Sequence, residues 1–444
     1  MKKIVGSLCL CSVLFAANEY EANLAGHIVI PAENFINAPK DAPEFLQSTG
    51  KFLRTTRNEN LGTFNANYTE EEMPNAFRIP FKKQALQGHS GIKFINDKNF
   101  WLLSDNGLGT KKNSPDSMTF IHNYEFYFKK GSYKHLKTIF FNDKNKKFPY
   151  LINLESTKSR YLTGADIDPE SFQIIDKSFW VGDEFGPFLL EFDEKGTLKE
   201  VFDVNLNKEP LLSPDHPNLQ LSNPDTQENK ANIKRSKGFE AMASSKDKTK
   251  LYPMLEYAVF KNGKYENKGG KNFLRILEFD IKARKFTDKS YTYTLESNAH
   301  SIGDFNMIDE KYGLIIERDD TEGTMDKACK NQETKSCFKN PAKFKRIYKI
   351  KLDDEKGIAQ KIAYIDLMNI NDTNKIAKKP LVNNKFVFPF FTIENVDIVD
   401  EKHIVVANDN NFPFSASREP FVPDDNEVIL LEVEEFLRLN NWVI

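Results

Sequence analysis

The sequence predicts an all-β protein, a β-propeller of six four-stranded antiparallel blades, although the repeats are also compatible with five or seven. Three observations predict this fold. A hairpin pattern recurs five times along the 444 residues, a second hairpin follows each copy, and aromatic residues make up 12% of the chain, which favours strands over helices. No break in composition separates the repeats, so we expect one propeller domain over residues 18–444.

The first hairpin of each unit has a constant order of residue types. A polar residue, a short apolar strand, a polar turn and a second apolar strand are followed by a polar or acidic residue. The units cover residues 90–105, 170–184, 240–256, 304–317 and 394–409. Because a hairpin returns to the point where it began, its opening residue and its closing acid emerge at the same edge of the sheet.

A second hairpin after each unit completes a four-stranded blade. Strand-like residues 20–80 remain, and we assign them to a sixth blade that the C-terminal strand could help to close. Residues 208–235 are rich in Pro, Asn, Asp and Lys and have no strand periodicity, so they are expected to form a long loop beside the mouth of the ring. A β-sandwich is the alternative, but repetition of the complete unit favours the propeller.

The N-terminus resembles a signal peptide over residues 1–17. Lys2 and Lys3 precede an apolar run over residues 4–15, and Ala16 and Ala17 are small residues suited to cleavage. The run is shorter than a membrane span of about 20 residues. We expect a periplasmic or secreted monomer. The lipoprotein alternative is disfavoured because a bulky leucine precedes each early cysteine.

Removal of the signal peptide would leave Cys329 and Cys337 of the four cysteines. In an oxidising compartment a pair that closes a short loop is expected to form a disulfide. A zinc site is disfavoured, because no His and no second Cys pair lies nearby to supply further ligands.

Charge and motif content exclude several functions. The chain has 62 Lys and Arg against 64 Asp and Glu, whereas binding to a nucleic-acid backbone requires a basic excess on one face. The Gly-x-Ser-x-Gly elbow of serine esterases does not occur, nor does a P-loop or a dinucleotide fingerprint.

Carboxylates crowded at the mouth of a propeller need a cation to neutralise them. Calcium takes six to eight oxygen ligands, about the number that several blades could supply together, whereas zinc or copper would favour His or Cys. The chain has only seven His. The sequence therefore predicts one or more calcium ions and a small anionic or ester substrate.

Six motifs occur along the chain in this order. They are Phe100-Trp-Leu-Leu-Ser-Asp105-Asn-Gly107, Asp166-Ile-Asp-Pro-Glu170, Asp183-Glu184-Phe-Gly-Pro187, Gly238-Phe-Glu240, Glu317-Arg318-Asp319 and Asn408-Asp-Asn-Asn-Phe-Pro413. Together they resemble the phytase-like family, also described as esterase-like activity of phytase. The resemblance covers about residues 88–433 and implies hydrolysis of esters or phosphoesters. Ser171 and Phe172 depart from the family pattern, which has Gly and an apolar residue at these positions.

The functional interpretation assigns a role to each motif. Metal ligands are expected to be Glu170, Glu240, Glu394 and Asp409, with Asp105 and Asp183 assisting. Catalytic candidates are Glu184 as general base, with Asp183 beside it, and His89 or His300 as the acid that protonates the leaving group. Substrate-binding candidates are Arg318, Arg418, Asn106 and Asn410.

Structural roles are the alternative for the same residues. Asp105 and Asp183 end strands, where Asp often bonds to the backbone of its own turn. Arg318 has acids on both sides and is compatible with an ion pair alone, and each His is compatible with an ordinary polar role.

Three functions compete. The first is a calcium-dependent hydrolase of phosphate esters or related small esters. The second is a metal-dependent sugar lactonase with one metal on the propeller axis, and the third is a propeller that binds a ligand without catalysis. The fold is shared by all three, so it does not decide between them.

Overall fold

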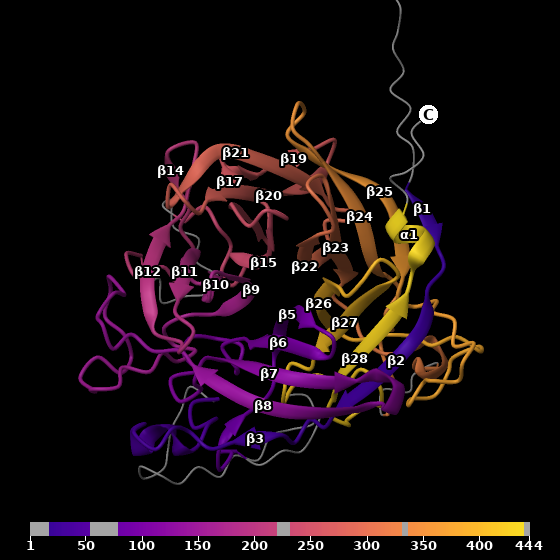
Figure 1. The fold of residues 1–444 in the computed structure, drawn as a ribbon, viewed down its shortest axis with the longest axis horizontal. Helices are drawn as coiled ribbons and strands as arrows, with labels where there is room; N and C mark the ends of the chain where they lie inside the picture. Colours follow the sequence, from indigo (N-terminus) through magenta and orange to yellow (C-terminus); the bar gives the residue numbers. More distant parts are fainter. Residues whose placement is uncertain (1–16, 54–78, 220–230, 331–335, 439–444) are drawn as a thin grey trace, which may run out of the picture.

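The computed structural model describes residues 17–53, 79–219, 231–330 and 336–438. Within these ranges the chain forms three separate four-stranded antiparallel sheets and one ten-stranded sheet. The ten-stranded sheet contains two more four-stranded antiparallel units, which are joined by one parallel pair, Thr292 with Ile358. The five units surround a central axis (Figure 1). The predicted all-β propeller is therefore confirmed. The predicted signal peptide lies outside the described residues, apart from Ala17.

Each four-stranded unit is a blade in which the first strand is innermost and the fourth is outermost. Blade one contains β5 (His89–Asn96), β6 (Asn99–Ser104), β7 (Phe120–Tyr127) and β8 (Ser132–Phe140). Blade two contains β9 (Pro169–Ile175), β10 (Ser178–Asp183), β11 (Phe188–Phe192) and β12 (Leu198–Asp203). Blade three contains β15 (Phe239–Ser244), β16 (Lys250–Leu255), β20 (Lys271–Asp280) and β21 (Lys285–Thr294).

Blades four and five complete the ring. Blade four contains β22 (His300–Met307), β23 (Tyr312–Asp319), β24 (Lys345–Asp353) and β25 (Ile358–Asp366), and β1 (Asn18–Tyr20) pairs in parallel with its outer strand. Blade five contains β26 (Thr392–Ile398), β27 (His403–Asp409), β28 (Asn426–Glu432) and β2 (Asn23–Ile30). Short strands pair outside the blades: β3 (Phe35–Ile36) with β4 (Gln84–Ala85), β13 (Asn205–Leu206) with β14 (Glu209–Pro210), β17 (Phe260–Lys261) with β18 (Lys264–Tyr265), and β19 (Asn267–Lys268) with β20.

The N-terminal strand β2 closes the ring. It pairs antiparallel with β28, so the two ends of the chain contribute to the same blade. Residues 20–80 were expected to form a sixth blade. Their described part instead supplies the outer strand of blade five, because β2 has the register and apolar alternation to pair with the C-terminal strand. The ring of five is continuous among the described residues: β5, β9, β15, β22 and β26 contact one another in cyclic order (Figure 1).

Apolar clusters between adjacent blades stabilise the ring. Blades four and five enclose Ile316, Ile393 and Val406, all buried. Between blades two and three, Trp180 packs against Phe202 and Phe279. Each such large side chain contributes about 1.5–3 kcal/mol when it is fully buried. The structure thus places Trp180 in the core.

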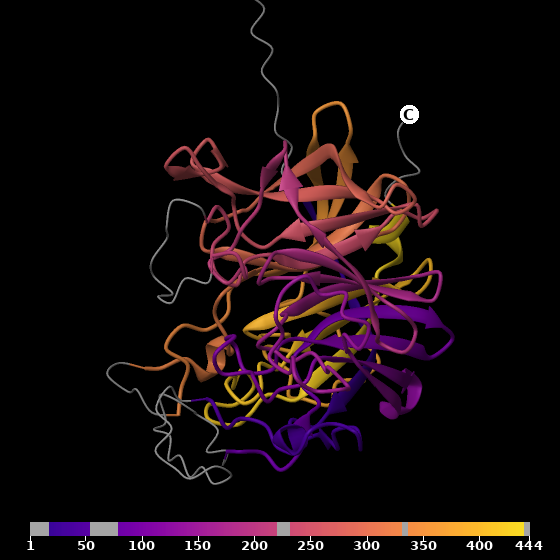
Figure 2. The same cartoon turned by 90° about the vertical axis from the view of Figure 1, so that its left-hand side faces the viewer.

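The two faces of the disc differ in their connections. One face has short hairpin turns, in which Asp97, Asp176 and Lys248 adopt left-handed backbone angles. The other face has the long connections, including 141–168, 204–238 and 320–344. In the edge-on view of Figure 2 the orange connection between β23 and β24 extends to the left, whereas α1 (Glu434–Arg438) lies on the right. The inner strands begin on the face with long connections, and we call the channel opening there the mouth.

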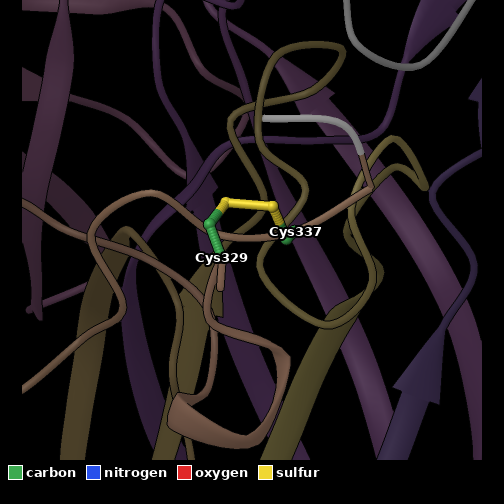
Figure 3. Close-up of a disulfide and its surroundings, with 2 residues drawn as sticks. All are labelled: Cys329 and Cys337. Carbon is green, nitrogen blue, oxygen red and sulfur yellow. A yellow bond between two sulfur atoms is a disulfide. The ribbon is translucent and has the colours of Figure 1, made fainter. Parts of the chain in front are cut away.

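A disulfide joins Cys329 and Cys337 in the connection between β23 and β24, as the sequence predicted (Figure 3). Their Cα atoms are 4.9 Å apart. A disulfide fits an extracellular or periplasmic protein. Within the described ranges we find no helix with the length and hydropathy of a membrane span.

Candidate functional site

Every inner strand contains a β-bulge near its start, at the mouth. In each case one extra residue of the inner strand interrupts the pairing with the second strand of its blade. A bulge leaves its extra residue outside the ladder and turns its side chain to a new direction, and bulges are frequent beside active sites. The five positions, which we call the bulge ring, are Ser90, Glu170, Glu240, Gly303 and Glu394.

A second ring is formed where the second strand of each blade ends. Three of its residues donate a backbone N–H to a carbonyl oxygen of the inner segment at 2.9–3.0 Å, and the other two pair with the inner strand in register. These positions, which we call the strand-end ring, are Asp105, Glu184, Glu256, Arg318 and Asp409. Their partners, each two residues before a bulge-ring residue, are Gly88, Asp168, Gly238, Ser301 and Thr392. Each blade contributes one residue to each ring, at equivalent positions. The two rings together place seven carboxylates and one guanidinium around the mouth.

Two groups of carboxylates are close enough to share a cation. Oxygen atoms of Asp168, Glu170 and Glu184 lie within 4.8 Å of one another, and the same holds for Glu184, Glu240 and Glu256. Glu184 belongs to both groups, so the two possible cation positions adjoin. The predicted ligands Glu170 and Glu240 are thereby placed on either side of Glu184.

Burial and mutual repulsion raise the pKa of these acids. Burial, followed by the neighbouring Asp168, raises the pKa of Glu170 well above its ordinary value. For Glu184 the causes are burial and then Glu256, and for Glu240 they are burial and then Glu394. Burial likewise raises the pKa of Asp168 to about 7. Without a cation, the site therefore favours bound protons.

Glu184 and Glu240 each have a buried carboxylate oxygen, Oε1, for which the structure shows no hydrogen-bond partner. Both side chains are almost fully buried, with 4% of each residue exposed. An unpaired buried carboxylate oxygen is energetically costly. A bound cation between the rings would satisfy both atoms.

The other predicted metal ligands in the rings are Glu394, Asp409 and Asp105. Glu394 accepts hydrogen bonds from Ser90 Oγ at 3.0 Å and from Arg318 at 3.2 Å. Burial and the nearby Glu394 raise the pKa of Asp409 well above its ordinary value, and burial and Asp409 do the same for Asp105. The structure therefore brings five of the six predicted metal ligands, all except Asp183, to the rings at the mouth, but places Glu394 in an ion pair.

Two cations accompany the acids. Arg318 donates to Asp320 at 2.7 Å as well as to Glu394, and its buried Nε has no hydrogen-bond partner in the structure. Lys237 forms an ion pair with Glu256. Burial lowers the pKa of each cation, but the surrounding carboxylates outweigh this effect and raise it. Both side chains therefore remain charged at neutral pH.

Three predicted residues position their neighbours. Asp183 accepts the backbone N–H groups of Asp168 and Gly186, each at 2.8 Å, which is the turn-stabilising role considered as its alternative. Asn106 donates Nδ2 to Asp168 at 3.0 Å. Asn410 accepts the backbone N–H of Gly88 at 3.2 Å and so links blade five to blade one.

The structure does not bring the other three predicted residues to the rings. The imidazole of His89 lies inside blade one, where its centroid is 5.9 Å from the centroid of the His122 imidazole. Burial lowers the pKa of His89 to about 3. His300 bonds to Glu317 at 2.9 Å, between blades three and four. Arg418 forms a bidentate ion pair with Glu427, at 2.9 and 2.5 Å, in blade five.

Sequence reasoning assigned no role to three residues that the structure places at the site. Asp168 and Glu256 belong to the two close carboxylate groups, and Lys237 is paired with Glu256. Asp168 lies in the Asp166–Glu170 motif, and Glu256 closes the third hairpin unit. Lys237 directly precedes the Gly238-Phe-Glu240 motif, and a lone cation beside an acid motif is the only signal that could have identified it.

Comparison with known proteins gives one family match. The family model described as "Phytase-like: Esterase-like activity of phytase" matches residues 84–412. No curated protein matches the chain significantly. Among solved structures, the periplasmic gluconolactonase of Pseudomonas aeruginosa is 11% identical, with 81% of this chain and 93% of that chain covered and a TM-score of 0.32. A GH43 β-1,3-galactosidase is 12% identical, with coverages of 78% and 91% and a TM-score of 0.39.

Proposed function

Because the chain belongs to the phytase-like family, we propose that it is a calcium-dependent hydrolase of phosphate esters or related small esters. The observation that supports this most strongly is the pair of close carboxylate groups that share Glu184. Glu184 and Glu240 each contribute a buried oxygen without a hydrogen-bond partner. These two oxygens repel each other when charged, and a bound cation would stabilise both.

The donor set fits calcium. All the close donors are carboxylate oxygens, which hard cations prefer, and calcium accepts six to eight such ligands. The residues that would hold it are Glu170, Glu184 and Glu240, with Asp168 and Glu256 beside them. When bound, calcium supplies a positive charge that polarises a phosphoryl or carbonyl oxygen.

Glu184 is the proposed proton acceptor. It has two carboxylate oxygens, so Oε1 can face a cation while Oε2 accepts a proton from a water molecule. The oxygen of that water attacks phosphorus, and the bond between phosphorus and the ester oxygen breaks. The proton taken by Glu184 then passes to the released alcohol, directly or through solvent, so that one water is consumed for each ester.

Arg318 and Lys237 are the proposed binding groups for the anion. A guanidinium presents several N–H donors in a plane and matches phosphate oxygens. Arg318 donates one terminal nitrogen to Asp320 and the other to Glu394, and the structure shows no hydrogen-bond acceptor for its Nε. Asp183 and Asn106 keep Asp168 in place and are proposed as positioning residues.

We also propose that the mature chain acts after export, as a monomer. The disulfide between Cys329 and Cys337 supports an oxidising compartment. The basic and apolar N-terminal residues support the same conclusion.

Removal of the metal is expected to abolish hydrolysis. Purified protein treated with a chelator and then desalted should hydrolyse a phosphomonoester at no more than about 1% of the calcium-loaded rate, since loss of a hydrogen-bonding partner of a metal ligand alone typically costs about 10–100-fold. Calcium should restore the rate. A panel that includes sugar lactones tests the lactonase alternative, because turnover of lactones alone would contradict the proposal. If calcium raises the melting temperature but no substrate is hydrolysed, the protein is a ligand-binding propeller.

A further inference from the structure

A cavity of about 550 Å³ opens on the face of the mouth, between the connections that precede blades two and three. Cationic side chains of Lys111, Lys112 and Arg235 line it together with two acids, Asp166 and Asp215. Its lining also has an apolar part, made by Phe148, Leu151, Ile152 and Pro217. The cavity therefore combines positive charge with an apolar wall, unlike the acidic rings.

The segments that line the cavity lead directly into the rings. Ala165 and Asp166 precede the motif that contains Asp168 and Glu170, and Ser236 precedes Lys237. The ammonium of Lys111 lies 5.4 Å from the ring centroid of Phe185, the residue after Glu184. A ligand at the rings would thus have this cavity as its neighbour.

Local bonds already satisfy the two acids of the cavity. Asp166 accepts the backbone N–H of Asn153 at 2.6 Å and the N–H and hydroxyl of Thr163 at 2.8 and 2.9 Å. Asp215 forms an ion pair with Arg235. Among the described residues of the lining, three cations accompany two acids, and the ammonium of Lys111 can attract an anion.

The apolar wall includes an unusually exposed side chain. Leu151 is 85% exposed, although it lies between Tyr150 and the buried Ile152 and close to the buried Phe148. Single exposed apolar residues are common, but this one lines a cavity next to a candidate catalytic site. Covering it with an apolar ligand group would remove its surface from water.

We infer that this cavity binds the organic group of the substrate, and that the preferred substrates are phosphate esters of an apolar alcohol, such as aryl phosphates. The inference rests on the proposed function for the reacting phosphoryl group. The organic group contacts Leu151 and its apolar neighbours, while Lys111, at the boundary with the rings, faces the negative phosphoryl oxygens. Polar esters such as glycerol phosphate gain no contact with this wall.

The test compares binding of phenylphosphonate and methylphosphonate, which cannot be hydrolysed, to the calcium-loaded protein by calorimetry. Phenylphosphonate is expected to bind about tenfold more tightly than methylphosphonate. Burial of part of a leucine-sized apolar surface accounts for a ratio of dissociation constants of about this size. Leu151→Asp should remove this preference, because it introduces a charge where the aryl group would lie. Leu136→Asp is the matched control: Leu136 is an exposed residue of β8, 39% exposed and not part of the cavity lining.

Hydrolysis separates this inference from the proposed function. For 1-naphthyl phosphate, kcat/KM should fall about tenfold in Leu151→Asp and stay unchanged for glycerol 2-phosphate. Equal affinity for the two phosphonates, no binding of either, or a preference that survives Leu151→Asp overturns the inference even if phosphoesters are hydrolysed. A phenyl preference that Leu151→Asp removes, without hydrolysis of any ester, supports the cavity and refutes the proposed function.

Discussion

Replacing Glu240 by Gln is expected to reduce calcium-dependent hydrolysis by at least about 100-fold, in line with the cost of disturbing metal-site residues. The substitution removes one charge from the group formed by Glu184, Glu240 and Glu256 and keeps the shape of the side chain. Calcium should bind more weakly in a calorimetric titration. The metal-free variant, however, should melt at a higher temperature than the wild type at pH 8, because burial and Glu394 disfavour the charged form of Glu240.

Glu191→Gln is the matched control. Glu191 is also a buried glutamate, but it lies in β11 and bonds to Ser178 at 2.8 Å and to Arg284 at 2.6 Å. Burial raises its pKa, but its bonds to Lys199 and Arg284 outweigh this and lower it. This variant should lose about 1 kcal/mol of stability, since its cationic partners are partly exposed, and should keep full calcium affinity. Equal behaviour of the two variants would contradict a special role for Glu240.

The metal-free protein is expected to be more stable at pH 5.5 than at pH 8. Burial raises the pKa of Asp168 to about 7 and that of Asp183 to about 6, and the pKa values of Glu184 and Glu240 are raised well above their ordinary range. The same groups titrate near pH 4 in the unfolded chain. Between these values the folded state binds more protons, so its stability falls as the pH rises. The melting temperature should rise by about 5 °C or more on acidification from pH 8 to 5.5.

Buried histidines act in the opposite direction. Burial lowers the pKa of His89 to about 3 and that of His122 well below its ordinary value. Both residues therefore reduce the stability of the folded protein as the pH falls below about 6.5, where the unfolded chain binds their protons more readily. The acids at the mouth outnumber them, which leaves the stability maximum on the acidic side. Calcium should raise the melting temperature most at pH 8 and so flatten the profile in differential scanning calorimetry. A metal-free protein that is most stable at pH 8 would contradict the buried, repelling cluster.

The pattern of apolar strands and polar turns in the sequence was enough to predict much of the fold and the acids at the mouth. Strand alternation and polar turns identify hairpins, and a hairpin places its two ends together whatever its tertiary setting. Glu170, Glu240, Glu394, Asp105 and Asp409 could therefore be assigned to one mouth. Blade closure depends on pairing between β2 and β28, which are about 400 residues apart. The sequence suggested that the C-terminal strand could help to close the ring, but the repeat did not show that β2 completes blade five instead of belonging to a sixth blade.

Tertiary packing decides the remaining roles. Arg418 and His300 each find an acid partner inside or between blades, and no local pattern distinguishes such a partner from a ligand. The departures from the fivefold pattern also follow from packing: at Gly303 an added Cβ would lie 1.9 Å from the carbonyl oxygen of Ile393. A side chain is excluded there, and Arg318 from the same blade contributes a cation where the other four blades contribute acids.

The most direct test of the central claim is an anomalous difference map from crystals of the mature protein grown with calcium and measured at a wavelength where its anomalous signal is strong. We predict a peak at the mouth, within about 2.3–2.6 Å of oxygen atoms from Glu184 and from at least one of Glu170 and Glu240. A map without a peak between the rings, or with calcium only at peripheral acids, would contradict the proposal that the two rings form a calcium site.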